Sequence, residues 1–373
     1  MSENTPHLLL IGGGHAHVAV LADWIRNGLP ARTNLITPSP TLRYSGMVPG
    51  WIAGQYDAKD GLVDLAALAE RAGAELVLDR CVGIDAEART ATTASGHEMA
   101  FDYASIDTGG VGQARKVLGD DPRLLDVRPI DRFVEQLSEW RRQYGDKACR
   151  IVVIGGGAGG VELAFALRNA SGFDPGPEVV LATGSGGLLP DFSRGLRARV
   201  ANELAAQNIK LSGVDARIEG GRLLVAGGSL EPADLIVAAV GSGAPDWLNG
   251  SGLERREGGF VAVDRVQRST LYPYVFAVGD VASRIDRNVP HSGVHAVHAG
   301  PVLAANLRAV VEGREPTRSY QPRPASLYLL STGDGCAIAS YGPLVAQGRW
   351  VARLKRWIDK RWIATYARLS QST

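Results

Sequence analysis

Two stretches of the sequence repeat one order of apolar and polar positions. Residues 7–27 contain the apolar run LLLI, three glycines and then apolar residues at helical spacing. Residues 150–169 follow the same order, with IVVI, the cluster GGGAGG and a helical pattern through Leu167. A short strand, a glycine turn and a helix start form the opening of a βαβ unit. Two widely separated copies therefore predict two nucleotide-binding domains.

Later segments indicate how the two units are divided. Residues 101–110 (FDYASIDTGG) and 233–243 (ADLIVAAVGSG) each predict a strand that ends in a glycine turn. Residues 263–282 predict a buried strand at 274–278 followed by Gly-Asp. We therefore expect an α/β protein with two Rossmann-like domains and a small C-terminal module. The expected parts are a discontinuous first domain (1–118 and 245–318), an inserted second domain (119–244), a proline- and arginine-rich linker (316–324) and the module (319–373).

Composition narrows the class of protein. The 373 residues are 45% apolar, which is ordinary for a globular chain, and the net charge of +1 argues against a nucleic-acid partner. Cys81, Cys149 and Cys336 are few and far apart, which favours a reducing, cytoplasmic compartment without a disulfide framework. Residues 1–7 lack the basic start of a secretory signal, and no apolar run is long enough to predict a membrane-spanning helix.

The two glycine turns suit a diphosphate, which needs backbone N–H donors and the positive end of a helix. The second turn fills all three positions of the G-x-G-x-x-G pattern, with Gly155, Gly157 and Gly160. The first has Gly12 and Gly14, but His17 takes the third position, so its helix must repack or sit further from the strand. His15 and Ala16 begin that helix as further cofactor candidates. The alternative is a glycine-rich turn without a ligand.

Neither unit has the acidic residue that commonly binds the ribose hydroxyls about 20 residues further on. Thr37 or Ser39 in the first unit, and Thr183 or Ser185 in the second, are weaker candidates for that contact. Without an acid to repel a 2′-phosphate, the choice between NADH and NADPH stays open.

The order and spacing of these motifs resemble the pyridine nucleotide–disulfide oxidoreductase superfamily over roughly residues 7–310. The resemblance implies a glutathione reductase-like two-domain fold, with FAD on the first unit and NADH or NADPH on the second. It also assigns Asp280 to the ribityl–diphosphate part of FAD, although a turn aspartate that caps a helix from Val281 is an alternative. The same resemblance adds four turn residues as cofactor candidates: Thr108, Gly109, Gly241 and Gly279.

A narrower resemblance leads to type II NADH dehydrogenases, in which the glutamate of a Gly-Val-Glu sequence lies near the nicotinamide. Here that residue is Glu162, for which a simple helix-dipole role is the alternative. Disulfide reductases carry a Cys-x4-Cys pair near residues 42–54, where this chain has no cysteine. Segments 45–50 and 331–335, with the C-terminal helix, resemble a subgroup associated with selenide, water dikinase, whose reaction the sequence leaves open.

Residues 290–307 resemble the helix whose N-terminal end points at the flavin pyrimidine. Gly293, Val294 and His295 are then the expected flavin neighbours, and His295 and His298 are candidate proton donors. The alternative is plain packing histidines, and without an adjoining acid or cysteine the cluster predicts no metal site. Met47, Val48 and Pro49 are expected to lie near the flavin, where an electron acceptor such as a quinone would approach it.

Residues 349–369 predict a basic amphipathic helix with seven basic residues and one acid. Its expected apolar positions are Trp350, Val351, Leu354, Trp357, Ile358, Trp362, Thr365 and Leu369. Tryptophans beside a basic face suit an anionic membrane surface, which would place the protein on the cytoplasmic face of the inner membrane. Docking of the helix on the protein itself or on a second copy in a homodimer stays open.

Together these features predict an FAD-dependent oxidoreductase that accepts hydride from NAD(P)H and passes electrons to a quinone or another small acceptor without a redox-active disulfide. The alternatives are a non-catalytic, redox-responsive flavoprotein resembling apoptosis-inducing factor, a sulfide:quinone oxidoreductase-like enzyme, and a fold whose nicotinamide site has decayed.

Overall fold

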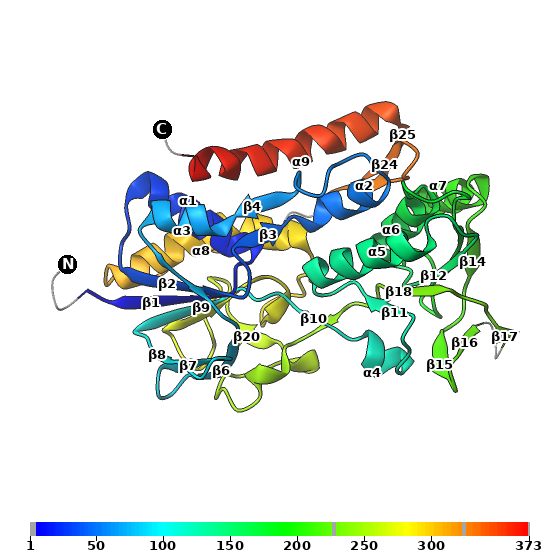
Figure 1. The fold of residues 1–373 in the computed structure, drawn as a ribbon. Helices are drawn as coiled ribbons and strands as arrows, with labels where there is room; N and C mark the ends of the chain where they lie inside the picture. Colours follow the sequence, from blue (N-terminus) through cyan, green and yellow to red (C-terminus); the bar gives the residue numbers. More distant parts are fainter. Residues whose placement is uncertain (1–4, 226–228, 323–325, 372–373) are drawn as a thin grey trace.

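The computed structural model describes residues 5–225, 229–322 and 326–371. The remaining positions, which include part of the expected linker and of the polar N-terminal segment, lie outside that range. Two parallel five-stranded sheets form the two halves of the molecule (Figure 1). The predicted α/β fold with two Rossmann-like units is therefore confirmed.

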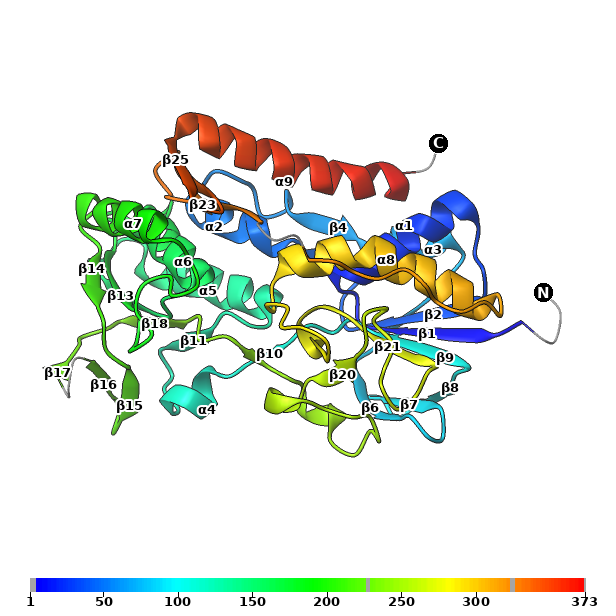
Figure 2. The same cartoon turned by 180° about the vertical axis from the view of Figure 1, so that it is seen from behind.

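The first sheet has the order β21-β9-β1-β2-β5. Its strands are β1 (His7–Ile11), β2 (Arg32–Thr37), β5 (Glu75–Leu78), β9 (Tyr103–Ile106) and β21 (Val275–Ala277). The apolar run 8–11 is fully buried in the centre of this sheet. Helices α1 (His15–Asn27) and α8 (Gly293–Val311) lie side by side (Figure 2), and a Cβ on Gly300 would lie 2.7 Å from that of Ala19. Helix α3 (Leu65–Ala72) packs against α1.

The second sheet has the order β11-β18-β12-β13-β14. Its strands are β11 (Leu124–Asp126), β12 (Arg150–Ile154), β13 (Glu178–Ala182), β14 (Lys210–Ser212) and β18 (Leu235–Ala238). Helices α5 (Ile130–Tyr144), α6 (Ala158–Arg168) and α7 (Arg194–Ala206) share one apolar core with this sheet. Helix α4 (Ala114–Leu118) and the small sheet β15 (Arg217–Glu219), β16 (Arg222–Val225) and β17 (Ser229–Leu230) complete this half.

Two short segments join the halves. Strand β10 (Val111–Gly112) leaves the first sheet and pairs antiparallel with β19 (Ser242–Gly243), which returns from the second. The strands of the first sheet fall within residues 1–118 and 245–318, and those of the second sheet within residues 119–244, as expected for the two domains. The exact domain boundaries stay predictions. The remaining strands of the first half are β3 (Thr41–Arg43), β4 (Leu62–Asp64), β6 (Cys81–Asp85), β7 (Thr90–Thr93), β8 (Glu98–Ala100), β20 (Val261–Val263) and β22 (Ala282–Arg284).

The C-terminal residues form an antiparallel sheet and a long helix. The sheet comprises β23 (Leu327–Ser331), β24 (Ala337–Tyr341) and β25 (Leu344–Gly348), and helix α9 (Arg349–Ser370) follows it. Helix α9 crosses the top of both halves (Figure 1). Beneath it lies the short helix α2 (Val48–Ile52), whose apolar residues join the core that the second sheet shares with α5, α6 and α7. Among the described residues, no helix has both the length and the apolar character needed to cross a membrane.

Candidate functional site

The N-termini of α1 and α8 meet at residues 44–46, and Glu162 of α6 lies close to the same segment, which we call the junction. The His15 ring at the start of α1 lies 5.8 Å from that of Tyr44. At the start of α8, a Cβ on Gly293 would lie 3.5 Å from Ser45 Oγ. These helix ends carry partial positive charge. A third helix, α6, reaches the same segment through Glu162, which lies beyond the first turn of α6 and not in it as the helix-dipole alternative requires, and through the charged groups around Glu162.

Glu162 takes part in a charged cluster beneath α9. Its Oε1 accepts a hydrogen bond from Ser331 N at 2.9 Å. Burial raises the pKa of Glu162, and the nearby Lys355 ammonium opposes that shift. Lys355 Nζ donates to Gly46 O at 3.0 Å and to Asp359 Oδ2 at 3.3 Å. The predicted catalytic glutamate is therefore linked to α9 by the charge of Lys355, which itself hydrogen-bonds Gly46 at the junction.

Two tyrosines close this cluster. The hydroxyls of Tyr44 and Tyr56 hydrogen-bond the Asp359 carboxylate, and Asp359 is only 3% exposed. Burial and the Asp359 charge raise the pKa of both phenols, so they stay protonated donors. The Tyr44 ring stacks on Trp362 at 4.5 Å between centroids. Helix α9 is thus anchored at the junction by both apolar and charged contacts.

The second glycine turn has room for a diphosphate. A Cβ on Gly160 would lie 2.0 Å from Gly155 O, so this glycine permits the close packing of helix on strand. Gly157 precedes α6 and has no other atom within 4 Å of the place where a Cβ would stand. That open space lies at a helix N-terminus, where phosphate oxygens find N–H donors. The geometry fits a dinucleotide.

The first turn has the same glycines but a different interior. His17, which replaces the third glycine of the pattern, is fully buried. Its Nδ1 lies 2.6 Å from Gly12 O and its Nε2 2.8 Å from Ser105 Oγ. Burial lowers the pKa of His17 to about 4, so the ring is neutral. The helix has therefore repacked around a histidine that is used structurally, one of the outcomes expected for this position.

Asp107 is a buried acid at this turn that the sequence argument did not single out. Its Oδ2 accepts hydrogen bonds from the backbone N–H groups of Ala16 and His17 at 2.8 and 3.0 Å. Burial raises the pKa of Asp107 to about 7, and the Asp280 charge adds to the effect. The residue follows the apolar strand β9 directly, and an acid at the end of a buried strand is the signal that could have identified it.

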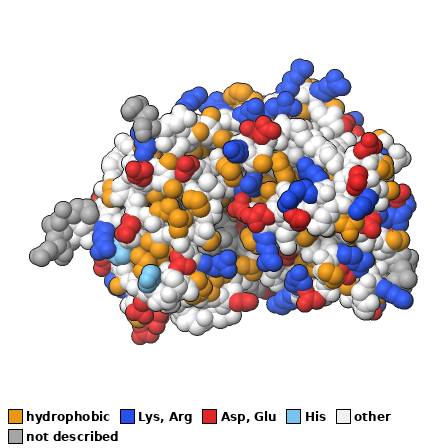
Figure 3. Space-filling model, in the orientation of Figure 1, with side chains coloured by type: hydrophobic (Ala, Val, Ile, Leu, Met, Phe, Trp, Pro, Cys, Tyr) orange, Lys and Arg blue, Asp and Glu red, His pale blue; other side chains and the backbone are white. Residues whose placement is uncertain are grey.

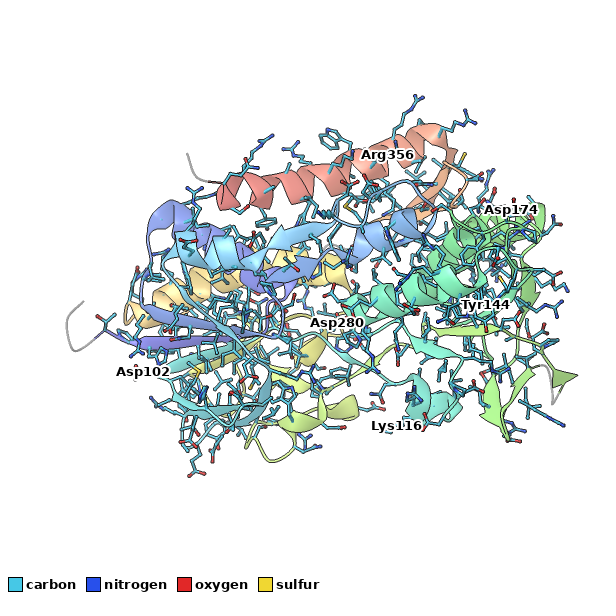
Figure 4. The ribbon with its side chains drawn as sticks, viewed as in Figure 1. Asp102, Lys116, Tyr144, Asp174, Asp280 and Arg356 are labelled. Atoms are coloured by element: carbon cyan, nitrogen blue, oxygen red, sulfur yellow. The ribbon has the colours of Figure 1, made fainter. Side chains whose placement is uncertain are left out.

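Asp280 lies at the centre of the molecule (Figure 4), in the turn that follows β21. It is 6% exposed, and Arg128 Nη2 donates to its Oδ2 at 2.6 Å. The residues from Gly279 to Val281 form a single 3-10 turn that leads into β22, so the alternative of an aspartate capping a helix from Val281 is wrong. Asp280 instead links the two halves through Arg128, a residue without a recognisable sequence signal.

The residues expected to contact the ribose differ between the two nucleotide-binding units. In the first, Thr37 Oγ1 donates to Ser39 O at 3.2 Å and Ser39 Oγ donates to Thr41 O at 2.8 Å, so both hydroxyl protons are used within the loop. In the second, the exposed Asp215 reaches the end of β13. Its Oδ1 accepts from Ser185 N at 2.8 Å.

Asp215 therefore supplies an acid at the place where the second unit lacked one in sequence. It comes from the loop after β14, some 30 residues beyond the expected position, which is why a fixed-spacing pattern missed it. On the opposite strand ends, Gly109 and Gly241 have open space around them. Thr108 is exposed beside Gly109. These three candidates lie in the turns that follow β9 and β18.

The histidines of α8 separate from one another. His295 is buried, and its Nδ1 lies 2.8 Å from Tyr320 Oη. Burial lowers its pKa. His298 and Val294 are exposed, and His291 Nε2 donates to Ala282 O at 3.1 Å. Among the described residues, no group of three His, Cys, Asp or Glu side chains is placed to hold a metal ion.

Met47, Val48 and Pro49 are buried beneath the junction. Val48 belongs to the core of the second half, so part of its role is packing. Met47 and Val48 nevertheless line a small pocket together with Tyr44, Trp51 and Tyr56. Cys336 lies at the end of the turn after β23, in which Thr332 O accepts a hydrogen bond from Asn169 at the C-terminal end of α6. Cys81, Cys149 and Cys336 are all free thiols.

Comparison with known proteins gives this arrangement a family. The profile of the pyridine nucleotide-disulphide oxidoreductase family matches residues 6–300. The type II NADH:quinone oxidoreductase of Haemophilus influenzae is 30% identical over 250 residues, which are 61% of this chain and 56% of that protein. The chain therefore spans little more than half the length of that relative. The sulfide-quinone reductase of Aquifex aeolicus is 32% identical over 28% of this chain and 24% of its own length.

A solved structure supports the fold over nearly the whole chain. The sulfide:quinone oxidoreductase from the hyperthermophilic bacterium Aquifex aeolicus superposes with a TM-score of 0.78 and covers 98% of this chain and 92% of its own. The sequence identity is 19%, so this likeness concerns the fold alone. With the family profile matching most of the sequence, the chain belongs to the pyridine nucleotide-disulphide oxidoreductase family.

Proposed function

We propose that this protein is an FAD-dependent oxidoreductase that accepts hydride from NADH and passes electrons to a quinone or a similar small acceptor. The family to which it belongs uses FAD and NAD(P)H. The observation that carries the proposal is that the N-termini of α1 and α8 and the Glu162 side chain of α6 come together at residues 44–46. Two of these helices follow glycine turns, so both dinucleotides would direct their reactive rings to one place.

The residues around the junction suit this chemistry. When bound, the flavin supplies a group that accepts hydride and then gives up electrons. The N-terminus of α8 places partial positive charge beside Ser45, where it stabilises negative charge on a reduced ring. Glu162, with its raised pKa, is placed to hold a proton near the nicotinamide end of α6. His295 remains a second candidate, held by Tyr320.

The proposed electron transfer needs no protein thiol. Residues 42–54 contain no cysteine, and Cys81 and Cys149 are both buried. Burial raises the pKa of each to about 11, so they are protonated and unreactive at neutral pH. A sulfide-oxidising mechanism that depends on paired cysteines is therefore disfavoured. The pocket lined by Tyr44, Met47 and Trp51 is the proposed acceptor site.

Asp215 favours NADH over NADPH. Its carboxylate is fixed at the end of β13 by Ser185 N, and a Cβ on Gly184 would stand 2.8 Å from its Oδ1. A carboxylate there can accept hydrogen bonds from ribose hydroxyls and repels a 2′-phosphate. The negative charge of Asp215 at the end of β13 is therefore the proposed reason for a preference for NADH over NADPH.

Helix α9 is proposed to contact an anionic membrane surface. The structure corrects the expected division of its faces, since Trp350 and Trp357 are each 57% exposed whereas Lys355 and Asp359 point inward. The helix also docks on its own protein. It packs on the core of the first half, formed by the first sheet with α1, α3 and α8, through Trp362, Ile363, Tyr366 and Leu369. Figure 3 shows Lys and Arg side chains along the edge that carries α9.

The outer face of α9 combines those two tryptophans with four exposed basic residues: Arg353, Arg356, Lys360 and Arg361. In Figure 4, Arg356 extends from the upper side of the helix. Aromatic rings among basic groups suit the interface of a bilayer that contains anionic lipid. We therefore propose that the protein binds the cytoplasmic face of a membrane, where a quinone is accessible, and we propose no nucleic-acid surface.

Closing the second turn tests the proposal. Gly157→Val places a branched side chain in the open space before α6, at a φ of −75° that valine adopts readily. The variant should retain FAD but lose reduction of the flavin by NADH, observed as bleaching of the visible absorbance without oxygen. Gly83→Val, in β6 beside Thr92, is the matched control and should be reduced normally. Full reduction of Gly157→Val by NADH would contradict the proposed nicotinamide site.

A further inference from the structure

The two glycine turns have nearly the same backbone. Gly14 and Gly157, the residues that precede α1 and α6, have φ/ψ of −75°/174° and −75°/175°. A Cβ on Gly12 would lie 2.5 Å from Asp107 O, and one on Gly155 would lie 2.3 Å from Ala239 O. Asp107 and Ala239 therefore occupy equivalent places, each directly after a parallel strand next to the central one. The second turn shows how the first would look without a side-chain carboxylate.

The two turns differ in what fills the space beside the helix end. At Gly157 that space is open, whereas at Gly14 a Cβ would lie 2.4 Å from the Asp107 carboxylate oxygen. The same carboxylate accepts from the N–H groups of Ala16 and His17. These donors at the start of α1 are those that a bound diphosphate would use. In the first turn, an acid of the protein already holds them.

The charges around Asp107 do not favour a second anion. Asp107 and Asp280 are 3% and 6% exposed, and the cation that Asp280 contacts is Arg128. On α1, burial lowers the pKa of both His15 and His17 to about 4, so neither ring carries positive charge at neutral pH. A diphosphate that arrives beside an ionised Asp107 would therefore add negative charge to two buried carboxylates, of which only Asp280 contacts a guanidinium.

We propose that Asp107 couples FAD binding to the uptake of a proton: its carboxylate holds the start of α1 while the site is empty, and it becomes protonated when the diphosphate binds. The inference rests on the proposed function, because it assumes that the first turn binds FAD. A protonated Asp107 no longer repels the diphosphate and can donate a hydrogen bond to it.

The direction of the pH effect follows from linkage. Burial raises the pKa of Asp107 in the empty protein to about 7, and the added diphosphate raises it further. Below that value the acid is already protonated, so FAD affinity does not change with pH. Between the two pKa values one proton is taken up for each FAD bound, so the dissociation constant rises about tenfold for each pH unit. FAD should therefore dissociate readily in alkaline solution.

The experiment follows release of FAD from the loaded protein. The holoprotein is diluted at pH values from about 6 to about 9, and the released FAD is measured at equilibrium by its fluorescence. Wild-type protein should release FAD increasingly above about pH 7. Asp107→Asn keeps an acceptor for the α1 N–H groups without ionising, so its release should not change with pH. Asp107→Ala, which reproduces the second turn, should also give a flat profile.

Asp64→Asn is the matched control, because Asp64 Oδ1 likewise caps a helix, accepting from Ala67 N at 2.9 Å, but on the surface. It should keep the wild-type pH dependence. A flat profile in the wild type, or an unchanged slope in both Asp107 variants, would overturn the inference while leaving the proposed function intact. A wild-type protein that holds no FAD at any pH would instead contradict the proposed function itself.

Discussion

The guanidinium of Arg128 donates to the Asp280 carboxylate at 2.6 Å and so ties the loop before α5 to the turn after β21. This ion pair connects the two halves of the molecule at the place where the flavin would lie. Removing Arg128 leaves Asp280 buried without its cation, which is costly, because a buried charge depends on its partner.

Arg128→Ala should therefore lower the free energy of unfolding by about 1–3 kcal/mol and weaken retention of FAD. Urea unfolding monitored by circular dichroism measures the free energy of unfolding. The fluorescence of FAD released from the protein measures its retention. Arg115→Ala removes a solvent-exposed ion pair with Asp120 and should change either quantity little. Equal effects of the two substitutions would show that the Arg128–Asp280 pair has no special role.

Lys355 gives a prediction with a defined pH dependence. Its ammonium counters the pKa rise that burial causes in Glu162 and Asp359. In Lys355→Met both folded-state pKa values should rise further above their unfolded values. The folded protein then binds more protons than the unfolded one, so stability falls as pH rises.

The loss of unfolding free energy in Lys355→Met should thus be larger at about pH 8 than at about pH 5, by roughly 1–2 kcal/mol. Urea titrations at both pH values measure it. Lys360→Met, on the exposed side of the same helix, serves as the control. If Lys355→Met were destabilised equally at both pH values, the assigned charge cluster would be wrong.

Asp215→Asn should weaken discrimination between the two nicotinamide coenzymes. Replacing the carboxylate removes the repulsion of a 2′-phosphate and weakens hydrogen bonds to the ribose, so the preference for NADH should fall about tenfold or more. Dissociation constants for NADH and NADPH, obtained by fluorescence titration, test this. Glu219→Gln, an exposed acid paired with Arg217, should keep the wild-type preference. A wild-type protein that binds NADPH more tightly would contradict the role given to Asp215.

The outer face of α9 predicts salt-sensitive binding to vesicles that contain anionic lipid. Each basic residue near such a surface contributes about 1 kcal/mol, so Arg353→Gln and Arg356→Gln should each weaken binding about fivefold. Trp357→Ser should weaken it further without lowering the melting temperature, because that ring is mostly exposed. Sedimentation with anionic and with neutral vesicles measures the effect. Equal binding to both vesicle types would remove the basis for an electrostatic membrane contact.

Some features of the site were predictable from sequence because their signals are local. The turns at Gly12 and Gly155 are such features, since strand, glycine cluster and helix start follow one another directly. The order of motifs in a known family also drew attention to Asp280, which the structure buries in the turn after β21; its contact with FAD stays a prediction. At the glycine turns, the residues that the tight backbone turn requires are also those that a diphosphate site requires.

Other features depend on tertiary packing. Asp215 reaches the end of β13 from a separate loop, and Arg128 meets Asp280 across 152 positions of sequence. The orientation of α9 was predicted in part only: Lys355 and Asp359 turn inward because Glu162, Tyr44 and Tyr56 provide partners there. A helical pattern shows which residues share a side, but the charges of the surface beneath decide which side is buried.

In the proposed reaction, hydride from NADH reaches a flavin held where α1, α6 and α8 come together. Rapid anaerobic mixing of the FAD-loaded protein with NADH, followed by mixing with a soluble quinone, tests it most directly. The oxidised flavin absorbance should disappear with one equivalent of NADH and return on addition of the quinone. Flavin that stays oxidised in the presence of excess NADH would contradict it.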